Sequence, residues 1–411
     1  MDRLTRIRTW IAVAVVVGSW SCGQDASPAA RFMEVVDSAG VRVVRNTAAS
    51  WGAGEAWLVE ADPEWVLGEL EGPAETRFFG ITDVAWRSDA GITVSDAGSS
   101  EVRAFGPDGT HLWTQGGEGD GPGEYRSLST LLPLPGDSVA VYDSRARRVS
   151  VVGPDGEFAR SVIPEPREGH TMAAPRVAVA SRLWVSAGGA RFDGDSPPSG
   201  TTAPPVSFFF ARPDGAVLDS ILSLPTAARL IQQNERGVSI WTVPFSVGAP
   251  MAGGGGRLVT ADPSAPVWTA RDSAGRVVQR VSFPSEARRL EDGDWAADLE
   301  VAVEGEDDPE RIRAVTEAYE AMDRPGEWPI LDEVILDGDG NVWIEAFQAR
   351  VDQGEPSRWW VFTGDGRLLG RVSLPAGLEV QAISRDRIVG VATDELGVER
   401  IQLHRIRRPG S

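Results

Sequence analysis

Residues 94–125 read VSDAGSSEVRAFGPDGTHLWTQGGEGDGPGEY, and this stretch contains the features that decide the fold. Apolar and polar residues alternate on both sides of a Pro-Asp-Gly turn, which predicts two antiparallel strands joined by a hairpin. The stretch ends in a glycine-rich run at 116–125. Whether that run holds a ligand or only connects strands bears directly on the function.

The same arrangement recurs along the chain. Comparable hairpins lie at 102–115, 149–162, 208–221, 267–281 and 359–372. A short strand precedes each of them, at 91–96, 137–143, 181–187, 256–262 and 340–346, and a sixth copy begins at 386–394. Further apolar stretches lie ahead of these, for example at 78–86 and 329–337.

About four short strands in each of six units predict an all-β fold, a six-bladed β-propeller of four-stranded antiparallel blades. The last unit lacks a fourth strand before the chain ends. We expect residues 55–68 to supply it, which would close the ring between the N- and C-terminal segments. A separate hairpin is expected at 33–46.

An acidic segment at 286–327 interrupts the repeats, and we expect it to be an insertion between the fifth and sixth units. Asp308 is suited to cap a helix whose first residue is Pro309. The pattern predicts a short helix at 308–323, with one apolar face formed by Ile312, Val315, Tyr319 and Met322. The insertion either covers one face as a lid or packs against the side of the barrel.

The N-terminus has the organisation of an export signal. Residues 1–21 combine three arginines with a short apolar run, too short to span a bilayer. Cys22, the only cysteine, follows this run and matches a bacterial lipoprotein processing site, although Ser19 and Trp20 depart from the usual pattern. We expect acylation of Cys22, a polar tether at 22–32, and the propeller at 33–411. Secretion with an incidental cysteine is the alternative.

The composition limits the partners. A formal charge of −20 repels the phosphate backbone, so a nucleic acid partner is not expected. A single cysteine excludes a disulfide within the chain. We expect an envelope-located monomer whose only membrane contact is the lipid anchor.

Four stretches together resemble a family of bacterial six-bladed β-propellers related to the NHL-repeat propellers. They lie at 37–46, 94–125, 137–158 and 336–347. The resemblance spans nearly the whole mature chain and is weak across 164–256. It implies the propeller fold and an envelope location, and it transfers no catalytic residues.

The glycine-rich run does not fit a phosphate loop, because no Gly-Lys-Ser/Thr follows and its acidic residues repel phosphate. Calcium is the alternative ligand, since Glu118, Asp120 and Glu124 offer oxygen atoms. A connection between two blades, with glycines permitting positive φ, explains the run without any ligand.

Strand direction predicts which residues share a face. In an up-and-down blade the second and fourth strands end on the same side, so Asp96, Asp143 and the glycine-rich run should lie together. A candidate binding face therefore comprises Asp96, Glu124, Tyr125, Asp143, Arg145, Arg147 and Arg148. The alternative role of Asp96 and Asp143 is Asx-type bonding to the backbone of their turns.

We expect a non-catalytic module that binds a protein, peptide or glycan of the envelope, without a cofactor. The competing hypothesis is a divalent-metal-dependent hydrolase, similar to propeller lactonases, or a lyase. Its site would lie in the central channel, near Asp83, Asp332, Glu333 and Glu345. Tryptophans on the strands are expected to pack between blades rather than to bind sugars.

Overall fold

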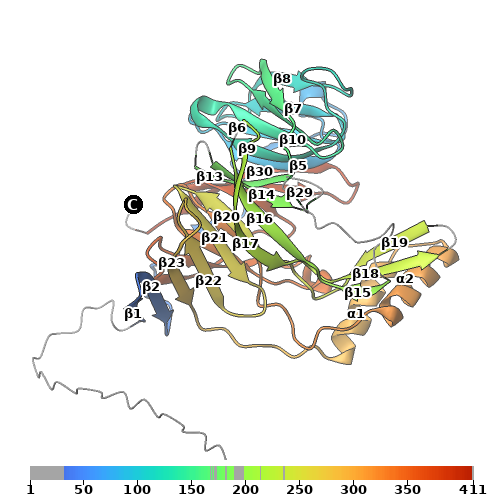
Figure 1. Ribbon diagram of the computed structural model, residues 1–411. Coiled ribbons are helices and arrows are strands. Elements are labelled where there is room, and N and C mark those ends of the chain that lie inside the picture. Colours follow the sequence, from blue (N-terminus) through green and yellow to red (C-terminus); the bar gives the residue numbers. More distant parts are fainter. Residues whose placement is uncertain are drawn as a thin grey trace, which may run out of the picture.

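The computed structural model describes residues 32–166, 168, 170, 174–180, 183–188, 199–212, 214–234 and 237–409. The expected signal peptide, Cys22 and nearly all of the tether lie outside the described residues. The described part is mostly β-structure with two α-helices (Figure 1). Neither helix of this part has the length and hydrophobicity needed to cross a bilayer.

Antiparallel sheets of four strands dominate the chain. The first sheet contains β5 (Ile81–Trp86), β6 (Ile92–Asp96), β7 (Glu101–Phe105) and β8 (His111–Gly116). The second contains β9 (Leu128–Pro133), β10 (Val139–Asp143), β11 (Arg148–Val152) and β12 (Phe158–Val162). The third contains β13 (Ala174–Ala180), β14 (Leu183–Gly188), β16 (Pro205–Ala211) and β17 (Val217–Pro225).

The remaining sheets incorporate the N-terminal strands. The fourth contains β20 (Met251–Gly254), β21 (Arg257–Asp262), β22 (Val267–Arg271) and β23 (Val277–Ser282), and it continues into β2 (Val41–Asn46) and β1 (Met33–Ser38). The fifth contains β24 (Leu331–Leu336), β25 (Val342–Ala346), β26 (Arg358–Phe362) and β27 (Leu368–Ser373). The sixth contains β28 (Glu379–Ile383), β29 (Arg387–Thr393) and β30 (Glu399–Arg407), with β3 (Leu58–Val59) and β4 (Trp65–Leu67) paired to β30.

The recurring Asp-Gly turns form the hairpins that the sequence predicts. In the first sheet, Gly109 has a φ of +80°, and the Asp108 carboxylate accepts from the backbone N–H of Thr110 at 3.1 Å. Asp155 and Asp214 accept in the same way from residues two positions further on. The aspartate fixes the turn and the glycine permits its left-handed backbone, so each turn joins the third and fourth strands of a sheet.

The first strands of the six sheets contact one another in the cyclic order β5, β9, β13, β20, β24, β28 and again β5. The prediction for residues 55–68 is confirmed, because Leu58 and Val59 pair with Arg407 and Ile406, and β4 pairs with β30 as well. The predicted hairpin at 33–46 forms and pairs in parallel with β23 (Figure 1). This arrangement of four-stranded sheets is consistent with a β-propeller.

Aromatic side chains fill the space between sheets. Trp184, Trp268, Trp343 and Trp359 are each at most 1% exposed. Trp268 of the fourth sheet meets Phe362 of the fifth edge to face, with ring centroids 5.9 Å apart. Burying a ring of this kind contributes roughly 3 kcal/mol, so these contacts are a main source of sheet-to-sheet cohesion. The expectation that strand tryptophans form the core is confirmed for these residues.

The acidic insertion contains two helices, α1 (Asp292–Val303) and α2 (Pro309–Ala321). The prediction of α2 is confirmed, with Asp308 as its N-cap and Pro309 as its first residue. The prediction missed α1, which begins with a capping box between Glu291 and Asp294. The insertion lies between the fourth and fifth sheets, so its expected place between the fifth and sixth units is wrong.

The helices pack against a small sheet that the sequence did not predict. It contains β15 (Gly200–Thr202), β18 (Arg229–Asn234) and β19 (Gly237–Thr242), which come from excursions around the third sheet. Figure 1 shows these strands beside α1 and α2 at one side of the molecule. Leu230, Trp295 and Tyr319 belong to the apolar cluster that joins the two layers.

Candidate functional site

The second and fourth strands of the first sheet end at one edge, as strand direction predicts. Asp96 at the end of β6 pairs with Glu101, which pairs in turn with Gly116 at the end of β8. The glycine-rich run starts at this edge. We call the side on which second and fourth strands end the exit face; it is marked by Asp96, Gly116, Asp143, Ser282 and Ala346.

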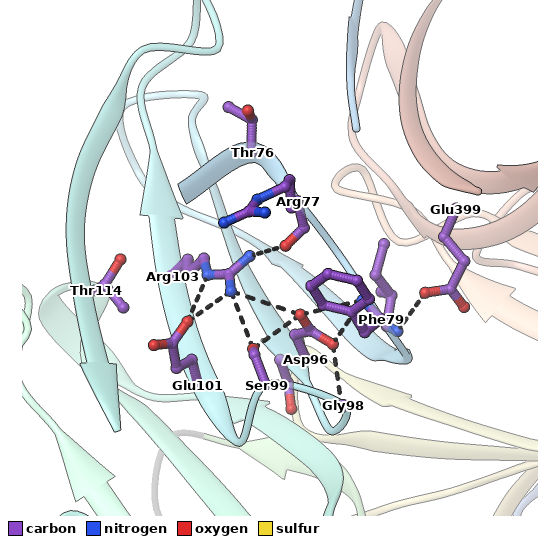
Figure 2. Close-up of polar contacts among 12 residues, drawn as sticks. Thr76, Arg77, Phe79, Asp96, Gly98, Ser99, Glu101, Arg103, Thr114 and Glu399 are labelled. Carbon is purple, nitrogen blue, oxygen red and sulfur yellow. Dashed lines mark hydrogen bonds and ion pairs between the residues drawn. The ribbon is translucent and has the colours of Figure 1, made fainter. Parts of the chain in front are cut away.

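Asp96 is fully buried and bonded within the protein (Figure 2). Its carboxylate accepts from the backbone N–H groups of Phe79 and Gly98, both at 3.2 Å, and from the hydroxyl of Ser99 at 2.8 Å. These bonds are the Asx-type arrangement that the sequence offers as the alternative to ligand binding.

Arg103 completes the network at this edge (Figure 2). It is 2% exposed and lies 3.6 Å from the Asp96 carboxylate. Its guanidinium also donates to the backbone oxygen of Arg77 at 2.6 Å and to the Glu101 carboxylate, and it stacks on Phe78 at 5.3 Å. Every charge in the cluster has a partner, so the cluster stabilises the edge of the first sheet.

Asp143 and Tyr125 are also buried and bonded internally. The Asp143 carboxylate accepts from three backbone N–H groups, those of Arg126 at 2.6 Å, Arg145 at 3.0 Å and Ala146 at 2.8 Å. The Tyr125 hydroxyl donates to the side chain of Gln115 at 2.6 Å. The polar atoms of both side chains therefore form hydrogen bonds with neighbouring segments of the protein.

Two of the remaining predicted face residues, Arg148 and Glu124, hold the glycine-rich run in place. Arg148 donates to the backbone oxygens of Asp120 at 3.0 Å and Glu124 at 2.5 Å. The Glu124 carboxylate accepts from the backbone of Gly121 at 2.8 Å. Arg145 is exposed, and Arg147 has a φ of +51° in the turn after β10. These contacts explain the run as a connection between the first and second sheets.

The exit face carries a pocket of about 880 Å³ that no sequence motif indicated. It lies between the end of β23, the end of β25 and the start of β26, and it reaches the segments before α1 and after α2. We call it the sheet-five pocket; it is lined by Pro284, Ser285, Glu286, Arg288, Trp328, Pro329, Ile330, Ala346, Phe347, Gln348, Asp352, Glu355, Pro356, Arg358, Trp359, Trp360 and Arg371.

The pocket exists because the fifth sheet departs from the first at equivalent positions. In the first sheet Val94 pairs with Arg103, and in the fifth Ile344 pairs with Trp360. Trp360 thus takes the position of Arg103. Ala346 takes the position of Asp96, since these residues pair with the starts of β24 and β5 respectively. The fifth sheet therefore lacks the ion network that closes the edge of the first.

A longer connection forms the rim of the pocket. The link between β25 and β26 runs over 347–357 and includes a short 3-10 helix, Arg350–Asp352. The side chain of Gln348 donates to the backbone oxygens of Asp352 and of Glu355, the latter at 3.0 Å. These bonds hold the connection in an open loop in place of the tight turn at 97–100 of the first sheet.

Arginines cover the aromatic faces of the pocket. Arg371 stacks on Trp360 with its guanidinium carbon 5.0 Å from the ring centroid. Arg288 stacks on Trp328 at 3.6 Å. The Asp294 carboxylate holds this second pair, accepting from Arg288 at 2.7 Å and from the Trp328 indole at 3.0 Å. Stacking fixes the plane of each guanidinium, and the edge of Arg371 remains available for hydrogen bonds.

A second group of carboxyl side chains lies on or opposite the first strands, which contact one another in a ring; we call the place where these strands start the channel mouth. Asp83 of β5, Asp332 and Glu333 of β24, Glu345 of β25 and Glu379 of β28 lie near the starts of first strands or opposite them. Burial raises the pKa of Asp83 to about 7. The backbone N–H of Leu131 in the next sheet donates to that carboxyl at 2.9 Å and opposes the increase.

The carboxyl groups of the fifth sheet raise one another's pKa. Burial raises the pKa of Glu333 to about 8, and the charges of Glu345 and Asp332 add to this. Burial likewise raises the pKa of Glu345 to about 7, opposed by a hydrogen bond from Ser357. A carboxyl pKa raised toward neutrality is a property shared with many general acids and bases.

The described residues do not fit a divalent metal. In the part of the chain that the structure describes, no three His, Cys, Asp or Glu side chains lie close enough together to hold one. This applies both to the channel carboxylates and to the acidic residues of the glycine-rich run. We therefore derive no step through a metal ion.

Comparisons with known proteins give a likeness of fold only. No protein-family model matches the chain, and no curated protein is similar to it in sequence. Solved structures that resemble it include a Bacteroides fragilis protein described as exported, with 12% identity, a TM-score of 0.49, and coverage of 86% of this chain and 95% of that one. A member of the DUF4221 family from Bacteroides vulgatus has 9% identity, a TM-score of 0.49, and coverage of 86% and 99%. Virginiamycin B lyase from Staphylococcus aureus has 8% identity, a TM-score of 0.40, and coverage of 85% and 99%.

Proposed function

We propose that this protein is an exported six-bladed β-propeller, anchored to the membrane through Cys22, that binds a ligand without catalysis in the sheet-five pocket. The cyclic order of contacts among the six first strands supports the blade number. The basic and apolar segments of residues 1–21, followed by the only cysteine, support export and anchoring.

The observation that carries the binding role is the pocket itself. Its volume of about 880 Å³ lies in the range of small-ligand sites, which combine apolar walls with a few oriented polar groups. Here Trp360 and Phe347 supply apolar surface, and Arg358 and Arg371 supply charge. Five residues of the predicted binding face, by contrast, make side-chain bonds within the protein, namely Asp96, Glu124, Tyr125, Asp143 and Arg148. The proposed site therefore lies on the expected face but over a different sheet.

Binding of defined glycans and peptides to the full-length protein in detergent tests this role. We expect at least one compound to bind the wild type and to lose binding in the double variant Arg358→Ala, Arg371→Ala. The single variant Arg385→Ala serves as the control, because Arg385 lies in the turn on the opposite face and its side chain is 76% exposed. Equal binding by the wild type and the double variant would contradict the proposal.

The second candidate function is a hydrolase or lyase acting at the channel mouth. The pKa values of Glu333 and Glu345, raised toward neutrality, favour it, because a carboxyl group that titrates near neutral pH suits proton transfer. A screen of the purified protein for hydrolase and lyase activity discriminates between the two functions. Activity that is lost in Glu333→Gln would favour the enzyme.

A further inference from the structure

We infer that the ligand of the sheet-five pocket is an oligosaccharide that contains a uronic acid. This inference rests on the proposed binding role of the pocket and adds the chemical class of the ligand.

Two arginines of the pocket wall are not paired with a carboxylate, and one of them, Arg371, is oriented by stacking on Trp360. Arg358 and Arg371 are both exposed at the pocket wall, and neither guanidinium makes a hydrogen bond or an ion pair with another described residue. The chain carries an excess of 20 negative charges, and several exposed arginines elsewhere, such as Arg126 and Arg276, are paired with carboxylates. Two neighbouring unpaired arginines are suited to a ligand carboxylate, which a guanidinium binds through two parallel hydrogen bonds.

The rest of the wall requires a ligand that also donates hydrogen bonds. Glu286, Asp352 and Glu355 line the same pocket, and no contact within the described residues uses their carboxylate oxygens. A densely charged anion such as a polyphosphate or a polysulfate would meet these three acids. A sugar acid can bond to both the arginines and the acidic residues of the wall. Its hydroxyl groups donate to the carboxylates, and its own carboxylate accepts from the arginines.

The backbone around the pocket disfavours an extended peptide. Peptides commonly bind by adding a strand to a free sheet edge. In the fifth sheet β26, which forms the pocket wall, already pairs with β25 on one side and with β27 on the other. Phe347 and the prolines at 284, 329 and 356 instead offer flat apolar surfaces, which suit the C–H faces of sugar rings.

Calorimetric titration of the full-length protein in detergent with a galacturonic acid trisaccharide tests the inference. We expect saturable binding that weakens at least about tenfold in Arg371→Ala and in Arg358→Ala, since each loses a charge-assisted hydrogen bond. The methyl-esterified trisaccharide, which keeps the hydroxyls and loses the charge, should bind at least about tenfold more weakly. Arg385→Ala should bind like the wild type.

The outcomes separate the two proposals. The protein could bind a neutral glycan or an acidic peptide instead of the uronate, with this binding still lost in the arginine variants. That result would overturn the inference and leave the proposed function standing. Equal affinity for the acid and its methyl ester would also overturn it. Failure of every compound to bind, with no effect of the arginine variants, would overturn both.

Discussion

Trp360 occupies in the fifth sheet the position that Arg103 occupies in the first, as the pairing of their strands shows. In the first sheet the arginine ties the edge together through Asp96 and Glu101. In the fifth the tryptophan gives the edge an apolar surface on which Arg371 stacks. The fifth sheet, with Ala346 in the position of Asp96 and a longer connection at 347–357, thus has a pocket where the first sheet has a closed polar edge.

Replacing Arg103 with alanine should lower the free energy of unfolding by about 3 kcal/mol, because Asp96 would be left as a buried charge without its ion-pair partner. Both residues are at most 2% exposed, so solvent cannot compensate for the loss. Urea denaturation monitored by tryptophan fluorescence measures the change. The exposed control is Arg276→Ala. If Arg103→Ala lowers the free energy of unfolding by less than about 1 kcal/mol, as the control does, the network stabilises the protein no more than a surface ion pair.

The variant Glu333→Gln should be more stable than the wild type, and the difference should depend on pH. The pKa of Glu333 rises from 4.5 to about 8 on folding. The unfolded chain therefore loses this proton at lower pH than the folded protein. The wild type loses stability as the pH rises from about 4.5 through about 8, whereas the glutamine does not titrate.

Thermal denaturation of both proteins at pH 4.5 and pH 8.5 measures this difference. The stabilisation by Glu333→Gln should be small at pH 4.5 and reach about 1 kcal/mol or more at pH 8.5. The variant Glu395→Gln, in the exposed turn after β29, should show no such trend. A stability difference between Glu333→Gln and the wild type that shrinks with rising pH would contradict the raised pKa of Glu333.

Deleting residues 33–68 should destabilise the protein and promote self-association. The deletion removes β1 to β4, so the edges of β23 and β30 that these strands cover become exposed. An exposed strand edge is a template for pairing with another chain. Size-exclusion chromatography and thermal denaturation measure both effects, and a deletion confined to the tether residues 24–31 is the control. A monomer with unchanged melting temperature would show that closure by this segment is dispensable.

Replacing Cys22 with serine should release the protein from the membrane fraction. Acylation requires the thiol, and no other cysteine can substitute for it. Cell fractionation of both proteins checks this release, and mass measurement of the wild type checks the acylation. The expected mass is that of the chain from Cys22 with attached acyl groups. A soluble wild-type protein of unmodified mass would end the anchor hypothesis and leave ordinary secretion.

Much of the fold follows from local patterns that the sequence displays. Alternation and the Asp-Gly turns at 108–109 and 155–156 predict hairpins, because the backbone bonds that form them lie within a few residues. The helix at 309–321 follows from its cap and its apolar periodicity. Helix α1 was missed because its residues, Asp292–Val303, have only weak amphipathic periodicity. The small sheet around β18 lies in the region with the weakest repeat.

The sequence by itself determined the repeated strands, the turns, and the side of the sheets on which Asp96 and Asp143 lie. It left two roles open for both residues, and the structure shows that their carboxylates bond to the turns around them. Only the tertiary structure decided where a pocket forms. Its walls come from segments near 286, 328, 347 and 371, which are far apart in the chain and meet only when the fourth and fifth sheets pack together. The raised pKa values at the channel mouth have the same origin, since burial and neighbouring charges arise from packing rather than from any local motif.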